Sequence, residues 1–472
     1  MKKKFIIPLL ILGMSIGACQ KNDDNIDVPI SEDFVPVVGP EGGTVDFHFS
    51  ATADWTASVE DTNTEESSWI DVTPKSGHSG ESKVTISVKP NETFDIRSAA
   101  ILIKCGMAEV RIYVDQKSIK DKIIDIPDPT FKSYCLDRAS FENGDGELSV
   151  EEAMRITSLY VYDMNIKSLQ GIEYFFNLTT LNCYNNNLSS LDVSNCTKLK
   201  HLECNNNNLS SLDVSNCTAL EYLNCDDNNL SSLDLSNCTA LEYLSCEKNN
   251  LTNLDVSSLS ALSTLVVHDN NLSSLDVSKC TKLVYLGCDN NSLSSLDLSK
   301  CTALENLYCS YNNLSSLDLS NCTKLRSMNC TNNNLSSLNV SNCTALTGIG
   351  CSYNNLTGLD LSNCTKLSGL YCSYNNLSSL DLSNCTKLTN LNCSDNELTT
   401  LDLSNNTDLK YFYCINNKLT ILDLSKNKLL SEYDYWIKIY GNPLQKLIIN
   451  YYGMIPKEIK DEYKDIIEYV YE

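Results

Sequence analysis

Cysteine is the residue type in this chain with the widest scope for chemistry. The 472 residues include 23 cysteines, and most of them fall in two rows that recur every 21 residues. One row runs through Cys183 and Cys204, and the other runs through Cys196 and Cys217. Thiols in such rows could form disulfides, bind zinc or act as nucleophiles. No CxxC motif accompanies them, which argues against a zinc site.

The residues that interrupt the two rows indicate what surrounds the thiols. Val267 replaces cysteine in the first row, and Leu259, Asn406 and Asn427 replace it in the second. Val267 and Leu259 are apolar, as a position in the core would require. Strands one repeat apart would hold Cβ atoms about 4.8 Å apart, which exceeds the ~3.8 Å typical of a disulfide. We therefore predict buried, free thiols that pack as small hydrophobic groups. One repeat loses both cysteines together, which leaves disulfide pairing as the alternative.

The sequence lacks the usual catalytic constellations. It contains four histidines and no G-x-S-x-G, H-E-x-x-H or phosphate-loop motif. His201 and His268 lie more than three repeats apart, so a cysteine–histidine pair does not assemble readily. The formal net charge of −24 argues against nucleic acid as a partner, because little would neutralise the phosphates. We predict a protein that is not an enzyme.

One short segment has the spacing of a calcium loop. It resembles half of an EF-hand, although Phe141 stands where the loop normally begins with aspartate. The alternative is a plain turn between two helices, the first capped by Asp128 before Pro129 and the second opened by a capping box at Ser149. No cofactor is certain, and Ca²⁺ is the one that the sequence suggests. Its predicted ligands are Asn143, Asp145, Glu147, Ser149 and Glu152.

The elements that position these residues follow from the 21-residue period. Leu199-x-x-Leu202-x-Cys204-x-x-Asn207-x-Leu209 recurs twelve times and resembles the repeats of internalin-like leucine-rich-repeat proteins. The resemblance covers residues 156–450 and implies a solenoid of about 14 rungs with a parallel sheet. A unit of 21 residues has no room for a full helix on the far side. We expect extended backbone there, or a second parallel sheet.

Two polar rows belong to this repeat. Asparagine occupies one position of all twelve rungs, from Asn186 to Asn417, and its buried amide is expected to bond backbone groups of adjacent rungs. Aspartate forms a second, outward row through Asp192 and Asp213, which Asn339 interrupts. Repulsion between these carboxylates requires local hydrogen bonds or cations, and we expect local backbone bonds.

A different pattern precedes the repeats. Residues 34–117 contain alternating apolar runs separated by turn residues, as in the strands of a sandwich. The segments around Trp55 and Trp69, with Pro74 to Gly77 and Val114 to Gln116, resemble the BACON domain, an immunoglobulin-like β-sandwich. We interpret it as a spacer with both tryptophans in its core. The alternative is a carbohydrate-binding module. A helical connector, residues 118–155, follows.

The first 19 residues have the pattern of a targeting signal. A basic start and an apolar run too short to span a bilayer lead to Gly17-Ala18-Cys19, which resembles the lipobox of bacterial lipoproteins. Cys19 would then carry lipid; the alternative is an ordinary secretory signal peptide cut near Ala18. The polar, acidic stretch from Gln20 to Asp24, at the start of the linker of residues 20–33, resembles a surface-export signal. These resemblances imply an outer-membrane lipoprotein exposed on the cell surface, bound to the membrane through its lipid alone. At the other end, residues 451–472 are predicted to form a helical cap.

Tyrosine provides the candidate binding residues. Rigid, amphipathic rings flank the predicted strands, and they favour a recognition surface on the concave face. The partner predicted from the resemblance is a protein, bound for recognition or adhesion; the alternatives are capture of a glycan and a purely structural stalk. The predicted ligand-binding residues are Tyr222, Tyr243, Tyr285, Tyr308, Tyr311, Tyr353, Tyr371, Tyr374, Tyr411 and Tyr413.

Overall fold

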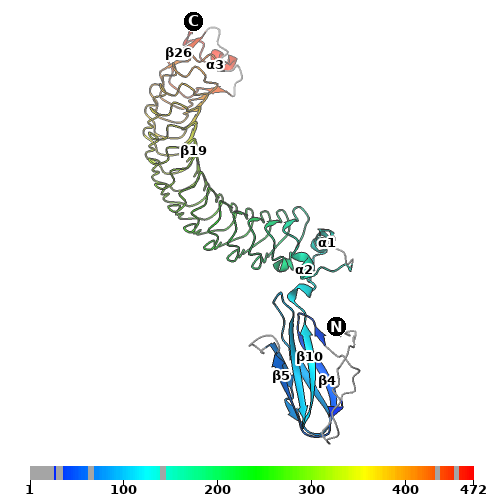
Figure 1. Ribbon diagram of the computed structural model, residues 1–472. Coiled ribbons are helices and arrows are strands. Elements are labelled where there is room, and N and C mark those ends of the chain that lie inside the picture. Colours follow the sequence, from blue (N-terminus) through cyan, green and yellow to red (C-terminus); the bar gives the residue numbers. More distant parts are fainter. Residues whose placement is uncertain are drawn as a thin grey trace. The chain divides into compact units, whose positions relative to one another are not determined.

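A computed structural model shows a mostly β protein divided into two compact units (Figure 1). The first unit comprises residues up to 125 and residues 135–155, and the second comprises residues 126–134 and the chain from 156 onward. The predicted lipidation site, Cys19, lies outside the described residues. No helix among the described residues is long and apolar enough to cross a bilayer. The structure describes residues 26–27, 36–61, 69–138, 145–430, 436–450 and 456–471.

The first unit is the predicted β-sandwich. One sheet has the order β3-β10-β9-β5-β7 and the other has the order β2-β4-β8-β6, with antiparallel pairing except between β3 and β10. Strand β2 lies in the segment predicted to be a linker. The strands are β2 (Ile26–Asp27), β3 (Val37–Val38), β4 (Gly43–Ala51), β5 (Trp55–Asp61), β6 (Ile70–Thr73), β7 (Ser76–Gly77), β8 (Gly80–Val88), β9 (Arg97–Cys105) and β10 (Ala108–Gln116).

Alternating apolar residues build the core of this sandwich. Trp55 and Trp69 are only 3% and 6% exposed, which confirms that both tryptophans fill the interior. The indole nitrogen of Trp55 donates to Ser82 Oγ at 3.0 Å, so its polar atom is satisfied. The guanidinium of Arg97 lies 4.5 Å from the centre of the Trp69 ring.

The connector contains the two helix starts that the sequence predicts. After the short 3-10 turn η2 (Ile119–Asp121), helix α1 spans Pro129–Arg138 and helix α2 spans Val150–Ala153. Asp128 Oδ1 accepts from the backbone N–H groups of Thr130 and Phe131 at 3.0 and 3.1 Å, which caps α1. The capping box at Ser149 is also present.

The second unit is the predicted solenoid, and its strands lie along the inner side of the curve (Figure 1). Fourteen short strands pair in parallel, and the central leucine or its replacement in each is buried. The turn η3 (Ile172–Tyr174) lies in the first rung. The strands are β11 (Ser158–Tyr160), β12 (Thr180–Asn182), β13 (His201–Glu203), β14 (Tyr222–Asn224), β15 (Tyr243–Ser245), β16 (Thr264–Val266), β17 (Tyr285–Gly287), β18 (Asn306–Tyr308), β19 (Ser327–Asn329), β20 (Gly348–Gly350), β21 (Gly369–Tyr371), β22 (Asn390–Asn392), β23 (Tyr411–Tyr413) and β25 (Ile437–Lys438).

The asparagine row binds the rungs to one another, as predicted. Asn312 Nδ2 donates to the carbonyl oxygens of Cys288, Cys309 and Ser310, while its Oδ1 accepts from the N–H of Leu293 at 2.9 Å. The same pattern recurs from rung to rung. Each amide therefore satisfies buried backbone groups of its own rung and of the rung before it.

The far side of the rungs is extended but forms no long second sheet among the described residues. Isolated parallel bridges join Asp192 to Asp213 and join Asn339 to its neighbours on both sides. A three-stranded parallel sheet appears only at the C-terminal end, with the order β24-β26-β27. These strands are β24 (Ile421–Asp423), β26 (Lys446–Asn450) and β27 (Ile467–Val470).

The predicted helical cap over residues 451–472 is wrong in its second half. Helix α3 covers only Lys457–Glu462, and Ile467–Val470 pairs with β26 as strand β27. Isoleucine, tyrosine and valine favour strands, and the exposed edge of β26 offers unpaired backbone groups that β27 satisfies. The tail thus closes the end of the solenoid largely through sheet pairing.

Candidate binding face of the solenoid

The strands of the solenoid sort their residues by position. In strands β11 to β23 the middle residue is buried, whereas the first residue is not and lies on the concave face. The third residue is also outside the core, except in β15 and β17, where Ser245 and Gly287 are buried. We call these outer positions column 1 and column 3. A turn follows each strand, and its residue in the left-handed region has φ between 48° and 55° in every rung from Asn185 to Asn416. Residues of this turn lie beside the columns.

The structure divides the ten predicted tyrosines among three sites. Tyr222, Tyr243, Tyr285 and Tyr411 occupy column 1, whereas Tyr308, Tyr371 and Tyr413 occupy column 3. The other three, Tyr311, Tyr353 and Tyr374, lie in the left-handed turn and are 57%, 47% and 47% exposed. The tyrosines therefore flank the sheet in separate groups. Their role in binding stays a prediction.

Stacking between rungs joins several of these rings to partners that the sequence reading missed. His201, Tyr222 and Tyr243 form a continuous stack, with ring centres 4.2 Å apart at both steps. Tyr353 and Tyr374 stack at 4.2 Å, and Tyr411 lies 4.5 Å from Trp436. Tyr162 and Tyr184, also missed, stack at 4.8 Å. The signal was present for all but Trp436: aromatic residues one period apart share a column.

The N-terminal half of this face is acidic. Lys248 pairs with Glu247 at 3.3 Å and with Asp227 at 3.7 Å. His268 Nδ1 lies 2.9 Å from Asp289 Oδ2. Burial disfavours the imidazolium of His268, but its bond to Asp289 and the carboxylates around it raise its pKa above the ordinary value. The carboxylates of this segment are Glu203, Asp226, Asp227, Glu247, Asp269 and Asp289.

Among these carboxylates, Asp226 has the surroundings that most disfavour a negative charge. Its Oδ1 accepts from Ser245 Oγ at 2.6 Å and from Glu247 N at 2.7 Å. Burial nevertheless raises the pKa of Asp226 to about 6, because those two bonds do not fully replace water and the carboxylates of Glu247 and Asp227 repel its charge.

We expect Asp226→Asn to stabilise the protein at pH 7.5 but not at pH 4. The folded chain holds the Asp226 proton more tightly than the unfolded chain, so stability falls as pH rises from about 4 to 6. Removing the charge should recover on the order of 1–3 kcal/mol above that window. Thermal midpoints across pH measure this effect. Asp227→Asn, next to it and paired with Lys248, should show no such gain, and an equal gain for Asp226→Asn at pH 4 would refute the mechanism.

The outward aspartate row is held by local backbone bonds, as predicted. Asp213 Oδ1 accepts from the N–H of Ser215 at 2.9 Å, and the same bond recurs along the row. The Ser215 hydroxyl and N–H hold the pKa of Asp213 below its usual value. These carboxylates therefore stabilise the turn in each rung.

The predicted calcium ligands are partly committed to other contacts. Glu152 Oε2 accepts from both the N–H and the hydroxyl of Ser149 at 2.8 Å, which is the capping box. Asp145 Oδ1 accepts from the N–H of Glu147 at 2.8 Å. Asn143 lies outside the described residues. Among the residues that are described, no three His, Cys, Asp or Glu side chains are grouped to hold a metal ion. The calcium site stays a prediction.

Comparisons with known proteins agree with this geometry. A family model described as "BACON: putative binding domain, N-terminal" matches residues 57–117. The functional domain of InlJ from Listeria monocytogenes is 33% identical with a TM-score of 0.61; the match covers 70% of this chain and 82% of that one, and the domain is described as including a cysteine ladder. This chain belongs to the internalin-like leucine-rich-repeat proteins. Its sandwich is a BACON domain.

Two further structures share the fold of this internalin-like protein. An internalin of L. monocytogenes, InlF, is 24% identical with a TM-score of 0.53, over 73% of this chain and 95% of its own. YopM from Yersinia pestis, a leucine-rich effector, is 21% identical with a TM-score of 0.51, over 72% of this chain and 99% of its own. At these identities the likeness concerns the fold alone. No curated sequence matches the chain.

The internalin-like repeats carry a cysteine ladder of their own. All 22 cysteines among the described residues are free and buried, which confirms the prediction of packed thiols. In the second row, Cys217 Sγ lies 3.6 Å from the carbonyl oxygen of Val193, in the preceding rung. Burial raises the pKa of Cys238 to about 11 and that of Cys217 to about 12. The thiols therefore stay protonated at neutral pH.

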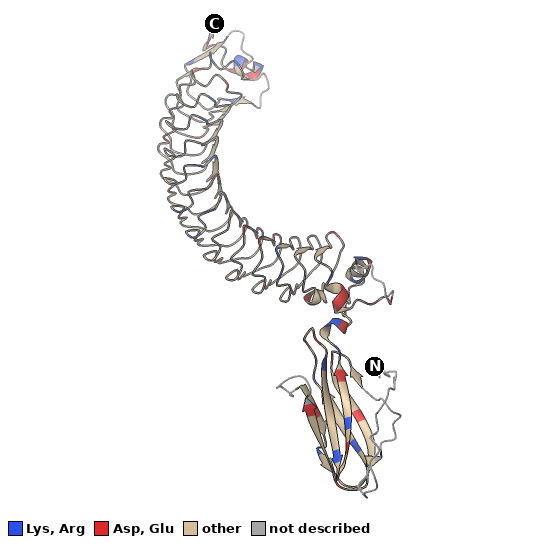
Figure 2. Ribbon diagram, viewed as in Figure 1, with Lys and Arg blue, Asp and Glu red and all other residues tan. Residues whose placement is uncertain are grey.

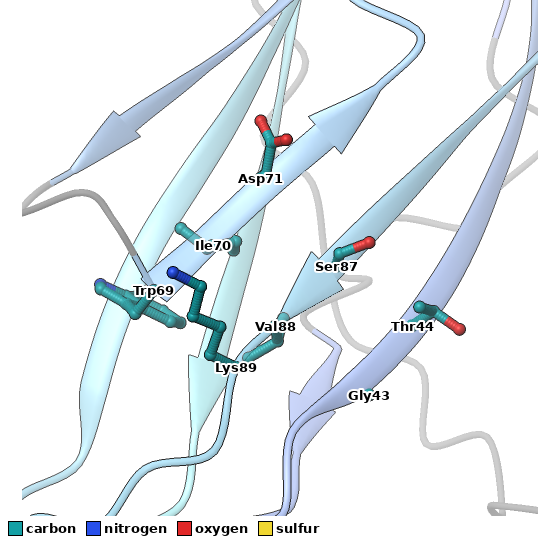
Figure 3. A pocket seen from close by; sticks show the side chains of 8 residues that line it. All are labelled: Gly43, Thr44, Trp69, Ile70, Asp71, Ser87, Val88 and Lys89. Carbon is teal, nitrogen blue, oxygen red and sulfur yellow. The ribbon is translucent and has the colours of Figure 1, made fainter.

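The BACON domain of the internalin-like protein has a hollow of about 480 Å³ beside Trp69 (Figure 3). Its wall is formed by residues of β4, β6 and β8, and Figure 3 shows Lys89 reaching across it. Trp69 is nearly buried and the Arg97 guanidinium lies over its ring, so Trp69 offers little ring surface to a sugar. This arrangement supports the interpretation of the domain as a spacer.

Proposed function

We propose that this chain is a non-enzymatic binding protein, anchored by lipid to the bacterial surface, that recognises or adheres to a protein partner through the concave face of its repeats. The outer columns carry this proposal. Both outer residues of nearly every strand lie outside the leucine core, so the face can vary from rung to rung while the core stays constant. The internalin-like fold favours protein–protein binding over other functions.

The stack of His201, Tyr222 and Tyr243 is the anchor that we propose for the partner. Rings held 4.2 Å apart are already ordered, so little side-chain entropy is lost when a partner covers them. The acidic segment surrounds this stack and favours partners with a basic surface. Tyrosine is enriched among the residues that dominate the binding energy of protein interfaces.

Location at the cell surface rests on the N-terminal sequence. The Gly17-Ala18-Cys19 segment supports lipidation, and the acidic linker supports export. Lipid on Cys19 would tether a body whose described residues contain no membrane-spanning helix. The outer membrane is therefore the location that we propose.

One cell-based experiment tests anchoring and recognition together. Cells expressing the full chain are incubated with soluble ectodomains of host-cell surface proteins, and bound ectodomain is measured on intact cells. We expect retention of at least one ectodomain, and about a tenfold weaker affinity with Tyr222→Ala and Tyr243→Ala combined. Tyr113→Ala, which alters an exposed tyrosine of the BACON domain, is the matched control. Cys19→Ala should release the chain into the medium.

The possible failures separate the parts of the proposal. Retention that survives the double tyrosine substitution would place the protein site elsewhere. No retention by any cells would favour the structural stalk. A Cys19→Ala chain that stays on the cells would refute the lipid anchor without affecting the binding face.

A further inference from the structure

The C-terminal half of the concave face contains an uncharged patch. Two columns across four successive strands, β19 to β22, carry only serine, glycine, asparagine and tyrosine. Charged residues are scattered along the solenoid (Figure 2), and the outer columns of β14 to β18 are also uncharged. There, however, the turns after β14 to β17 carry Asp226, Asp227, Glu247, Asp269 and Asp289, whereas the turns after β19 to β21 carry no charged residue. We call the eight outer residues of β19 to β22 the Tyr371 patch: Ser327, Asn329, Gly348, Gly350, Gly369, Tyr371, Asn390 and Asn392.

The floor of the patch lacks side chains at three adjoining positions. A Cβ atom built on Gly348 would have its nearest neighbour at 3.9 Å, the hydroxyl oxygen of Ser327, so this site is open. At Gly350 the side chain of Asn329 already covers the backbone, with Oδ1 2.5 Å from where Cβ would lie. The surface is therefore lowest at Gly348 and is bordered by Asn329 on one side.

The Tyr371 ring borders the same low point on the other side. Its Cε2 lies 3.5 Å from the Cβ position of Gly369, and its hydroxyl accepts from Asn390 Nδ2 at 3.3 Å. These two contacts show that the ring lies along the sheet. Tyr371 is 46% exposed and, within the part of the chain that the structure describes, has no stacked aromatic neighbour. One ring face is thus open to solvent, unlike the Tyr222 ring, which is stacked between His201 and Tyr243.

Hydrogen-bond donors stand at both ends of the patch. Asn329 Oδ1 accepts from Thr331 N and Asn392 Oδ1 accepts from Ser394 N, both at 3.1 Å. These bonds orient the two amides, and among the described residues no acceptor is found for either Nδ2 group. Three strand spacings separate the amides, which is roughly 14 Å. That span accommodates two or three sugar rings.

We infer that the Tyr371 patch is a binding subsite for a neutral oligosaccharide. An open aromatic ring offers its face to the C–H groups of a pyranose, and the fixed amides match its hydroxyl groups. The absence of charge on a chain with a net charge of −24 argues for an uncharged ligand. This inference goes beyond the proposed function, because it assigns a second ligand class to a separate part of the face.

Calorimetric titration of the full chain tests the inference. The probes are cellohexaose, xylohexaose, maltohexaose, mannohexaose and laminarihexaose, with hexagalacturonate as the charged comparator. We expect at least one neutral hexasaccharide to bind and hexagalacturonate not to bind. Tyr371→Ala should weaken that binding about tenfold, whereas Tyr371→Phe, which keeps the ring, should bind nearly as well as the original chain.

Matched variants separate the site from effects on folding. Gly348→Gln fills the low point of the patch without a backbone clash and should abolish binding. Gly358→Gln makes the same change on the far side of the same rung, where an added Cβ meets nothing within 4 Å, and should bind normally. Tyr113→Ala should also bind normally.

Three results would overturn the inference. The first is that no neutral hexasaccharide binds at millimolar concentration. The second is that binding survives both Tyr371→Ala and Gly348→Gln. The third is loss of a protein partner, but of no sugar, in these variants, which would assign the patch to the protein interface. The protein proposal would fail separately, if binding of a protein partner survived the combined Tyr222→Ala and Tyr243→Ala substitutions. These substitutions leave the Tyr371 patch intact.

Discussion

Asn312→Ala is expected to lower the free energy of unfolding by about 3–6 kcal/mol. The substitution removes one buried amide that makes four hydrogen bonds, three to carbonyl oxygens and one from the N–H of Leu293. Each buried group that loses its partner costs about 1–3 kcal/mol, and the small alanine leaves no polar atom in its place. Water cannot readily repair the loss, since Asn312 is only 7% exposed.

Urea denaturation followed by circular dichroism measures this loss, and hydrogen exchange locates it. Protection should fall first in the rungs containing Leu293 and Cys309, because repeat proteins couple mainly to their nearest neighbours. Asn313→Ala changes the next residue, which is exposed, and should alter stability by less than about 0.5 kcal/mol. A cost for Asn312→Ala as small as that of Asn313→Ala would show that the amide row does not hold the rungs together.

The native protein is expected to leave its described cysteines unmodified by iodoacetamide at pH 8, whereas all 22 should react in guanidinium chloride. The thiolate is the reacting species, and a rise in pKa to about 12, as for Cys204, lowers its amount by about a thousandfold or more. Burial adds a second barrier, because the thiols are fully covered by the core. Intact-protein mass spectrometry counts the modified groups.

An exposed thiol provides the positive control for that experiment. Ser316→Cys places a cysteine on an exposed turn of the same solenoid and should be modified within minutes in the native protein. Rapid native modification of several ladder cysteines would contradict the buried thiol rows. A mass too low by two hydrogens per pair, restored by reductant, would instead establish the disulfides that the sequence left open.

The repeat made most of the solenoid predictable. A 21-residue period places the leucines, cysteines and asparagines of the repeated motif in fixed columns, so the buried positions of one rung predict those of the others. The same logic identified the backbone-bonded aspartates. Where the period ends, prediction failed: the pattern of Ile459, Ile466 and Val470 suits a helix, but the open edge of β26 draws Ile467–Val470 into a strand.

The candidate site was less predictable than the fold, for a physical reason. Sequence spacing placed the tyrosines outside the core, but ring orientation depends on which neighbours are small. Tyr371 lies flat because Gly369 leaves room for it, whereas Tyr222 stands between His201 and Tyr243. The prediction was built on tyrosines and therefore omitted His201 and Trp436, which stack on Tyr222 and Tyr411.

The asparagine row allows the distance between two sites on the solenoid to change by whole repeats. Each asparagine bonds its own rung and the one before it, so inserting or deleting a whole 21-residue unit recreates every bond at the junction. Tyr222 and Tyr371 belong to strands that are seven registers apart, which is roughly 34 Å along the sheet. Duplication of repeats between them would move the two sites apart in steps of about 4.8 Å, without redesign of either site. The spacing of ligands that one molecule can hold is therefore set by repeat number, and unequal recombination within the gene can tune it.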